Sequence, residues 1–211
     1  MKTRNETDMN EQRENGKIGG LAESLVIAFS MYSRIPMPMV AWTEKGMKYA
    51  LCFFPAVGIA VGAAVAAFWQ LSRLLGLGDL SRLCVETALP LLITGGIHMD
   101  GFLDTVDARS SHQSRERKLE ILKDPHAGAF AIAGCGVYLL FYAAAFSELS
   151  PEAFPGIAGV FVMSRALSGY SVVTFPKAKK DGLVTAFAKG ASQAPAAVSG
   201  ILLCWLVGGF F

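Results

Sequence analysis

Long apolar segments separated by shorter polar ones make up most of this chain. The first, from Leu21 to about Ser33, is too short to cross a membrane, because a crossing helix takes about 20 residues. We expect it to form an interfacial or re-entrant helix. Five later apolar segments predict crossing helices, at residues 49–75, 83–97, 128–146, 157–173 and 194–211. The pattern predicts an all-α fold, a polytopic transmembrane helix bundle.

The composition also indicates a membrane protein. Hydrophobic residues make up 53% of the chain and charged residues 17%, against roughly a quarter in a soluble domain. Gly58 and Gly62 are spaced for close helix packing in lipid. The net charge of +2, without a basic arm, indicates no nucleic-acid partner. Residues 1–17 mix acids and bases and predict a flexible tail, which leaves residues 18–211 as a single membrane-embedded domain.

The polar stretch at residues 98–126 holds all three histidines and six acids. Asp100, Asp104 and Asp107 follow one another at spacings of four and three, so on a helix they share one stripe. Three like charges repel each other, and a bound cation would relieve that repulsion. Carboxylates are hard oxygen ligands, which favour Mg²⁺, Mn²⁺ or Ca²⁺ over zinc. We interpret the stripe as a divalent-metal site at a membrane surface; an acidic turn that caps a helix is the alternative.

The Lys and Arg residues predict the orientation in the membrane. They gather in residues 98–126 and 175–190, whereas the turn at residues 147–155 has none. Loops rich in Lys and Arg stay in the cytosol, so we predict a cytosolic acidic loop at 98–126, on the same side as 175–190. Arg165 lies inside an apolar segment, where a charge is costly and usually faces protein, water or a ligand. Arg34 either binds an anion or anchors the end of the first helix.

These residues together favour phosphoryl transfer at the cytosolic membrane face. Mg²⁺ typically takes one or two carboxylates and leaves its other positions to substrate phosphates, whose charge it neutralises while it holds the leaving group. Lys123 and the lysines of residues 175–190 would bind the remaining phosphate charge. Gly101 has no side chain and would let a phosphate approach the backbone closely.

Four stretches resemble one known family, the cobalamin synthases, also called adenosylcobinamide-GDP ribazoletransferases. The signature stretch is residues 95–107, with the sequence GGIHMDGFLDTVD. The other three are, in order, residues 33–36 (SRIP), 121–129 (ILKDPHAGA) and 175–183 (FPKAKKDGL). The resemblance covers about residues 20 to 190, and the combination of stretches is specific.

The resemblance implies a multi-pass enzyme of the bacterial cytoplasmic (inner) membrane that needs Mg²⁺ and faces the cytosol. Such an enzyme joins α-ribazole, or its 5′-phosphate, to adenosylcobinamide-GDP, the last assembly step of the cobalamin nucleotide loop. GMP leaves, and adenosylcobalamin or its phosphate forms. The expected partners are therefore these two substrates and the lipid bilayer. The oligomeric state stays open, a homo-oligomer included.

The implied reaction suggests roles for the polar residues of this catalytic domain. Mg²⁺ would be held by Asp100, Asp104, Asp107 and Asp124. The proton of the attacking 5′-hydroxyl would go to Asp100, Asp104 or His98, although a structural role for His98 is the alternative. Substrate would be bound by Arg34, Lys123, Arg165 and Lys177. For Arg165, the alternative is a buried ion pair with the acids.

Two departures from the family pattern affect the site. Ala108 follows Asp107 where the family usually has glycine, and an acidic motif of the form Gly-Gly-x-Thr-Gly-Asp is absent near Phe211. We therefore expect a C-terminally truncated chain; the alternative is a shortened relative, active or not. If the motif supplies further ligands, this chain lacks part of the site.

Two other classes of membrane protein also use acidic residues. CDP-alcohol phosphotransferases carry the order D-x-x-D-G-x-x-A-R, whereas here Asp100 and Gly101 come first. An ion-coupled transporter would need charges near the middle of the membrane and paired broken helices in two halves. The sequence shows neither feature, since its acids cluster in one stretch.

Overall fold

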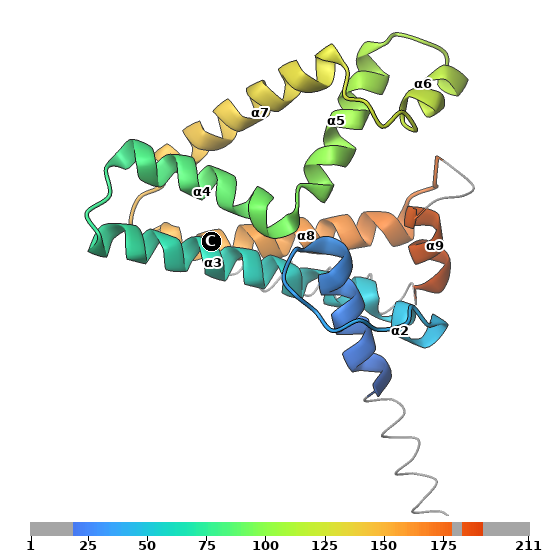
Figure 1. Cartoon of the computed structure of the whole chain (residues 1–211), viewed down its shortest axis with the longest axis horizontal. Coiled ribbons are helices and arrows are strands. Elements are labelled where there is room, and N and C mark those ends of the chain that lie inside the picture. Colours follow the sequence, from blue (N-terminus) through green and yellow to red (C-terminus); the bar gives the residue numbers. More distant parts are fainter. Residues whose placement is uncertain (1–18, 179–182, 192–211) are drawn as a thin grey trace, which may run out of the picture. The chain divides into compact units, whose positions relative to one another are not determined.

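Helices form every regular element in the part of the chain that the structure, a computed structural model, describes: residues 19–178 and 183–191 (Figure 1). The elements in order are the Gly19–Tyr32 helix, α2 (Glu44–Lys48), the 3-10 turn η1 (Ala50–Phe53), α3 (Phe54–Leu74), α4 (Asp79–Thr94), α5 (Ile97–Ser110), α6 (Arg115–Ile121), α7 (Ala129–Ser147), the 3-10 turn η2 (Phe154–Gly156), α8 (Ile157–Thr174) and α9 (Leu183–Gly190). The predicted all-α fold is confirmed over these residues.

Three helical segments are long and apolar enough to cross a membrane: Ala50–Leu74, Ala129–Ser147 and Ile157–Thr174. They agree with the first, third and fourth crossing helices that the sequence predicts. The predicted second span lies in a bent pair, α4 and α5, which meets the same criterion only when both helices are counted together. The predicted fifth span and the N-terminal tail lie outside the described residues.

The chain forms two compact units, which we describe separately. Unit 1 comprises the described residues of Met1–Gly58 and Phe161–Phe211, and unit 2 is Ile59–Val160. Both α3 and α8 therefore contribute one end to each unit.

Unit 1 is built around a small apolar core under the Gly19–Tyr32 helix. Ile27, Leu51 and Phe187 are almost fully buried in it. Ser24 is also fully buried, and its hydroxyl donates a 2.6 Å hydrogen bond to the carbonyl of Gly46 in α2. A Cβ on Gly46 would lie 2.7 Å from Cδ1 of Ile27, so a side chain there would displace the end of the buried Ile27 side chain. At 14 residues this first helix is too short to span a membrane, as predicted.

The small-residue stripe of α3 packs against α8 in both units. In unit 1, a Cβ on Gly58 would lie 2.6 Å from the carbonyl oxygen of Phe161. In unit 2, a Cβ on Gly62 would overlap Ala158. The predicted packing role of this glycine pair is confirmed, since neither position has room for a side chain.

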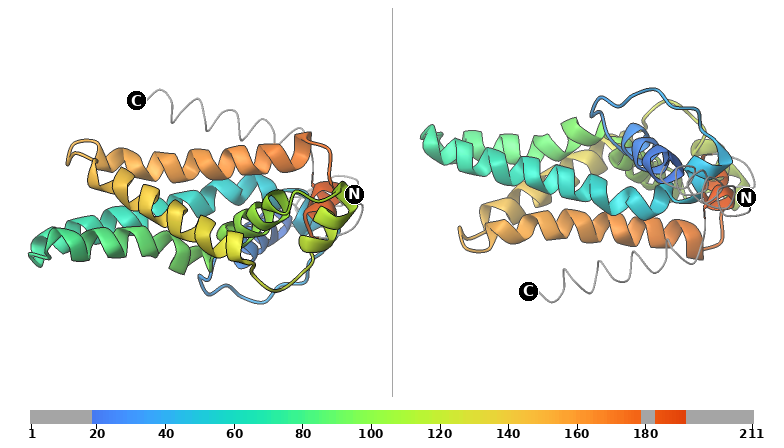
Figure 2. Two further views of the ribbon diagram at one scale, coloured as in Figure 1. Left: turned by 90° about the horizontal axis from the view of Figure 1, so that it is seen from above. Right: turned by 90° about the horizontal axis from the view of Figure 1, so that it is seen from below.

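In unit 2 the backbone turns sharply between α4 and α5. Gly95 and Gly96 have φ angles of 66° and 76°, in the left-handed region that glycine enters without a Cβ penalty. Two such residues in succession bend the axes by 95° (Figure 1), and both helices then pack on α7. The turn at residues 75–78, which joins α3 to α4, stands at the left end of both panels of Figure 2.

Candidate functional site

The three aspartates of the signature stretch lie on one helix, α5, as their spacing predicts. They therefore share one stripe of its surface. The expected polar loop is helical over this part, because α5 continues to Ser110 before the chain turns toward α6. Asp100 is exposed, while Asp104 and Asp107 are half-buried.

Asp107 caps the neighbouring helix α7. Its Oδ2 accepts a 2.6 Å hydrogen bond from the backbone N–H of Gly128, and its Oδ1 accepts one of 2.8 Å from that of Ala131. Gly128 is the N-cap residue of α7 and has no side chain to cap it, so the first N–H groups need an acceptor from elsewhere. The carboxylate also meets the positive end of the helix dipole. The alternative interpretation, a helix-capping acid, thus describes Asp107.

Glycine is required at the capped end of α7. A Cβ on Gly128 would lie 2.7 Å from Oδ1 of Asp107, so a side chain there would push the carboxylate away. The pair therefore fixes how α5 packs on α7, and Val106, one residue earlier, lies against Gly134 of α7.

Asp100 and Asp104 are the stripe's other carboxylates, one helical turn apart. Within the described residues, no hydrogen bond or ion pair engages the Asp100 carboxylate, and no three potential ligands are grouped closely enough to hold a metal ion. A pair of carboxylates nevertheless fits Mg²⁺, which typically takes one or two and completes its shell with water and substrate phosphate. Asp107 can add a ligand only if it shares the oxygens that cap α7.

The other predicted site residues of unit 2 lie at the two ends of this region. His98 is half-buried in the first turn of α5. Lys123 and Asp124 are exposed in the turn after α6, a helix that packs on α5. Oδ1 of Asp124 accepts hydrogen bonds from the backbone N–H of His126 (2.9 Å) and pairs with its ring Nδ1 (2.8 Å). These hydrogen bonds lower the pKa of Asp124 below its ordinary value.

The remaining predicted substrate ligands belong to unit 1. Arg34 is exposed just after the first helix, which ends where the Ser33 hydroxyl donates 2.7 Å to the carbonyl of Phe29. Arg165 is buried in α8, with its Nη1 3.3 Å from the Ser164 hydroxyl. Lys177 is half-buried and donates through Nζ to the carbonyl of Phe175. The structure thus places three of the expected cations in one unit and the aspartates in the other.

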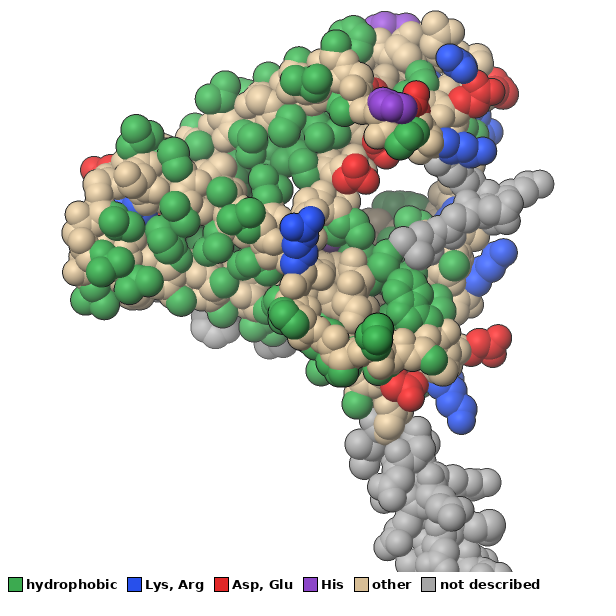
Figure 3. Space-filling model, viewed as in Figure 1, with side chains coloured by type: hydrophobic (Ala, Val, Ile, Leu, Met, Phe, Trp, Pro, Cys, Tyr) green, Lys and Arg blue, Asp and Glu red, His purple; other side chains and the backbone are tan. Residues whose placement is uncertain are grey.

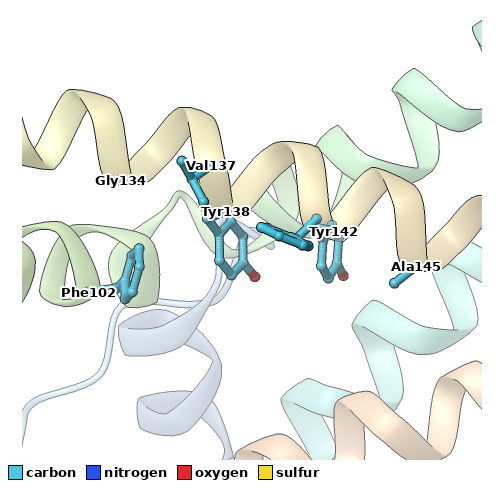
Figure 4. Close-up of a pocket in the computed structure, with 7 residues that line it drawn as sticks. Phe102, Gly134, Val137, Tyr138, Tyr142 and Ala145 are labelled. Atoms are coloured by element: carbon cyan, nitrogen blue, oxygen red, sulfur yellow. The ribbon is translucent and has the colours of Figure 1, made fainter.

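An aromatic hollow on α7 is a feature that the sequence analysis missed. It has a volume of about 540 Å³ and lies beside Phe102 of α5 (Figure 4). The Tyr138 ring lies 5.6 Å from Phe102 and 5.5 Å from Tyr142, to which it is nearly parallel. The helical spacing of Tyr138, Tyr142 and Phe146 was the available signal. This aromatic wall lies where α5 and α7 pack together.

Comparison with known proteins gives one consistent result. The family model described as cobalamin-5-phosphate synthase matches residues 24–211. An adenosylcobinamide-GDP ribazoletransferase of Lachnoclostridium phytofermentans is 51% identical over 179 residues, which is 85% of this chain and 69% of the relative. Proteins of the same name are 33% identical in Clostridium botulinum strain Eklund 17B (81% and 68% covered) and 31% identical in Treponema denticola (87% and 70%). No solved structure matches.

Proposed function

Because the chain belongs to the cobalamin-5-phosphate synthase family, we propose that it joins α-ribazole, or its 5′-phosphate, to adenosylcobinamide-GDP. The relatives named adenosylcobinamide-GDP ribazoletransferase support this assignment. The structural observation that carries it is the pair Asp100 and Asp104, two carboxylates one turn apart on α5, of which Asp100 is exposed.

The proposed reaction is a displacement at phosphorus. The 5′-oxygen of the ribazole forms a bond to the phosphorus nearer the corrinoid, and the bond from that phosphorus to the bridging oxygen breaks. GMP leaves with the bridging oxygen, and the 5′-hydroxyl proton passes to a base. Asp100, Asp104 and His98, all within the first two turns of α5, are the candidate bases.

Mg²⁺, when bound, would neutralise the diphosphate and stabilise the departing GMP. Asp100 and Asp104 would hold it through carboxylate oxygens, with Asp124 as a further candidate. Asp107 supports this pair indirectly, because its hydrogen bonds to α7 hold α5 in place. Gly101 adjoins open space, with no described atom within 4 Å of a Cβ built there, which leaves room for a phosphate beside Asp100.

Cationic residues would bind the phosphates and orient the diphosphate. Lys123 lies in unit 2, and Arg34, Arg165 and Lys177 lie in unit 1. Charge-assisted hydrogen bonds from these ammonium and guanidinium groups would strengthen the binding of the phosphates.

We further propose that the protein lies in the bacterial cytoplasmic membrane with α5 toward the cytosol. The apolar segments Ala129–Ser147 and Ile157–Thr174 would carry the chain across and back, so residues 98–126 and 175–190 share one side. Both stretches are rich in Lys and Arg, which favours the cytosolic side.

The test measures GMP release by the protein in membranes, with adenosylcobinamide-GDP and α-ribazole as substrates. We expect GMP and a cobalamin product in equal amounts, no GMP when α-ribazole is omitted, and loss of both products with EDTA that Mg²⁺ restores. GMP release that does not depend on α-ribazole would mean a hydrolase and would overturn the proposal. Activity that is unchanged by EDTA would mean that the reaction does not need a bound metal ion.

A further inference from the structure

A basic depression lies between the two short helices of unit 1. None of the residues to which the proposed function gives a role lines it. It measures about 700 Å³, and α2 and α9 line it. Three lysines, Lys45, Lys48 and Lys189, line it, Glu44 is the one acid in its lining, and Met47 and Gly190 line it as well. We call it the α2–α9 basin.

The backbone around the basin is firmly held. A Cβ on Gly190 would lie 3.2 Å from Cβ of Met47, so α9 packs tightly on α2. The Thr43 hydroxyl caps α2 by accepting from the N–H of Gly46 (3.0 Å), whose carbonyl in turn accepts from the buried Ser24 hydroxyl. Phe187 of α9 is buried in the apolar core of unit 1. The lysine stems therefore start from fixed positions.

The ammonium groups of the basin are available to a ligand. All three lysines are exposed, and among the described residues none of them forms an ion pair, although Glu44 stands on the same helix as two of them. The ammonium group of Lys48 lies above the ring of Tyr49, with Nζ 5.4 Å from the ring centroid. Figure 3 shows charged side chains standing out from the surface around α2 and α9. Three cations around one depression attract a multiply charged anion.

We propose that the α2–α9 basin binds a phosphate group. Lysines bind phosphate as point charges, and the excess of three cations over one anion matches a phosphate dianion or a diphosphate. Lys48 comes two residues before the apolar segment Ala50–Leu74, so the basin stands at the end of a candidate membrane span. The phosphate can therefore come from a soluble ester, such as a nucleotide. It can also come from an anionic phospholipid, whose headgroup lies at the membrane surface, where a membrane span ends.

Competitive acetylation of lysines, read by mass spectrometry, tests the proposal without any turnover. The whole protein is placed in phosphatidylcholine nanodiscs with and without inorganic pyrophosphate, and separately in nanodiscs that contain phosphatidylglycerol. We expect slower acetylation of Lys45, Lys48 and Lys189 together, either with pyrophosphate, which identifies a soluble phosphate, or with phosphatidylglycerol alone, which identifies a lipid headgroup. Lys118 of α6 in unit 2 serves as the control and should react at the same rate throughout.

Alanine variants then test whether the three lysines act together. Each of Lys45→Ala, Lys48→Ala and Lys189→Ala should weaken binding of the effective anion about fivefold, and Lys118→Ala should leave it unchanged. Unchanged acetylation rates in both arms, or equal slowing of Lys118, would overturn the proposal. The result does not depend on the proposed transferase activity, because no corrinoid substrate is present.

Discussion

The two units of this protein carry opposite charge. The described residues of unit 1 hold six bases and two acids: Arg34, Lys45, Lys48, Arg165, Lys177 and Lys189 against Glu23 and Glu44. Unit 2 holds ten acids and seven bases, and three of its acids are the aspartates of α5. Carboxylates attract a metal ion and ammonium groups attract phosphate. Under the proposed function, the candidate metal ligands all lie in unit 2, whereas three of the four candidate phosphate-binding residues, Arg34, Arg165 and Lys177, lie in unit 1.

The units also differ in how they hold their charges. Asp100, Asp104 and Asp107 of unit 2 share a single helix of 14 residues, whose direction is set by two left-handed glycines and by the cap on α7. The lysines of the α2–α9 basin come from helices of 5 and 8 residues, and their long side chains can adjust. A metal ion demands fixed ligand positions, whereas lysine binds a phosphate with loose geometry.

The largest expected effect concerns the acids of α5. Asp100→Asn and Asp104→Asn should each lower GMP release on the order of 100-fold, because a neutral amide holds Mg²⁺ poorly. The measurement is the rate in membranes over a range of Mg²⁺ concentrations. Asp79→Asn is the control, since that exposed acid of unit 2 pairs with Arg82 by a 2.9 Å contact, far along the chain from α5. Near-normal rates at saturating Mg²⁺ would mean that Asp100 and Asp104 do not hold the metal ion. The proposed difference in binding between the two units would then be wrong.

The next effect separates two acids of the same helix. Asp107→Ala should lower the free energy of unfolding by about 1–2 kcal/mol, because two N–H groups of α7 lose their acceptor. The matched control is Asp100→Ala, which removes the same charge from α5. Among the described residues the Asp100 carboxylate has no hydrogen-bond partner, so stability should change by less than about 0.5 kcal/mol. Denaturant unfolding in mixed micelles, followed by circular dichroism, gives both values. Equal losses would mean that the cap contributes nothing.

The direction of α5 can be tested at its start. Gly96→Ala places a side chain at φ 76° and should cost about 1–2 kcal/mol. Gly101→Ala on the same helix has an ordinary φ and open space around the added Cβ, so it should gain up to about 1 kcal/mol in stability. We expect Gly101→Ala to lower GMP release all the same, since the methyl group would occupy the space proposed for a phosphate. Full activity of Gly101→Ala would mean that no phosphate binds in the space beside residue 101.

The smallest effect is a shift in the titration of Asp124. Hydrogen bonds from His126 lower its pKa below the ordinary value of 3.8. A lowered folded-state pKa stabilises the fold above the unfolded value, and that contribution is lost as the pH falls through the folded-state pKa. His126→Ala, which removes the ring but keeps the backbone N–H, should raise the pKa of Asp124 toward 3.8. Carboxyl-detected NMR with labelled aspartate would measure it, and an unchanged pKa would mean that the ring contributes nothing.

Sequence reasoning predicted the helical elements well because membrane burial leaves a strong local signal. Apolar runs of about 20 residues identify crossing helices, and three of the predicted spans agree with helices of the structure. The stripe on α5 followed from residue spacing alone. The bend at Gly95 and Gly96 was not anticipated, since a pair of glycines is equally compatible with a loop, a turn or a helix end.

The sequence by itself determined that the chain is helical and apolar and that it carries Asp100, Asp104 and Asp107 on one stripe, because helical periodicity depends on neighbours along the chain. Only the tertiary structure decided which of these carboxylates is already engaged. Asp107 meets the N–H groups of residues 21 and 24 positions later, and Lys45 shares a depression with Lys189. Such long-range pairings depend on how helices pack, which no local pattern specifies.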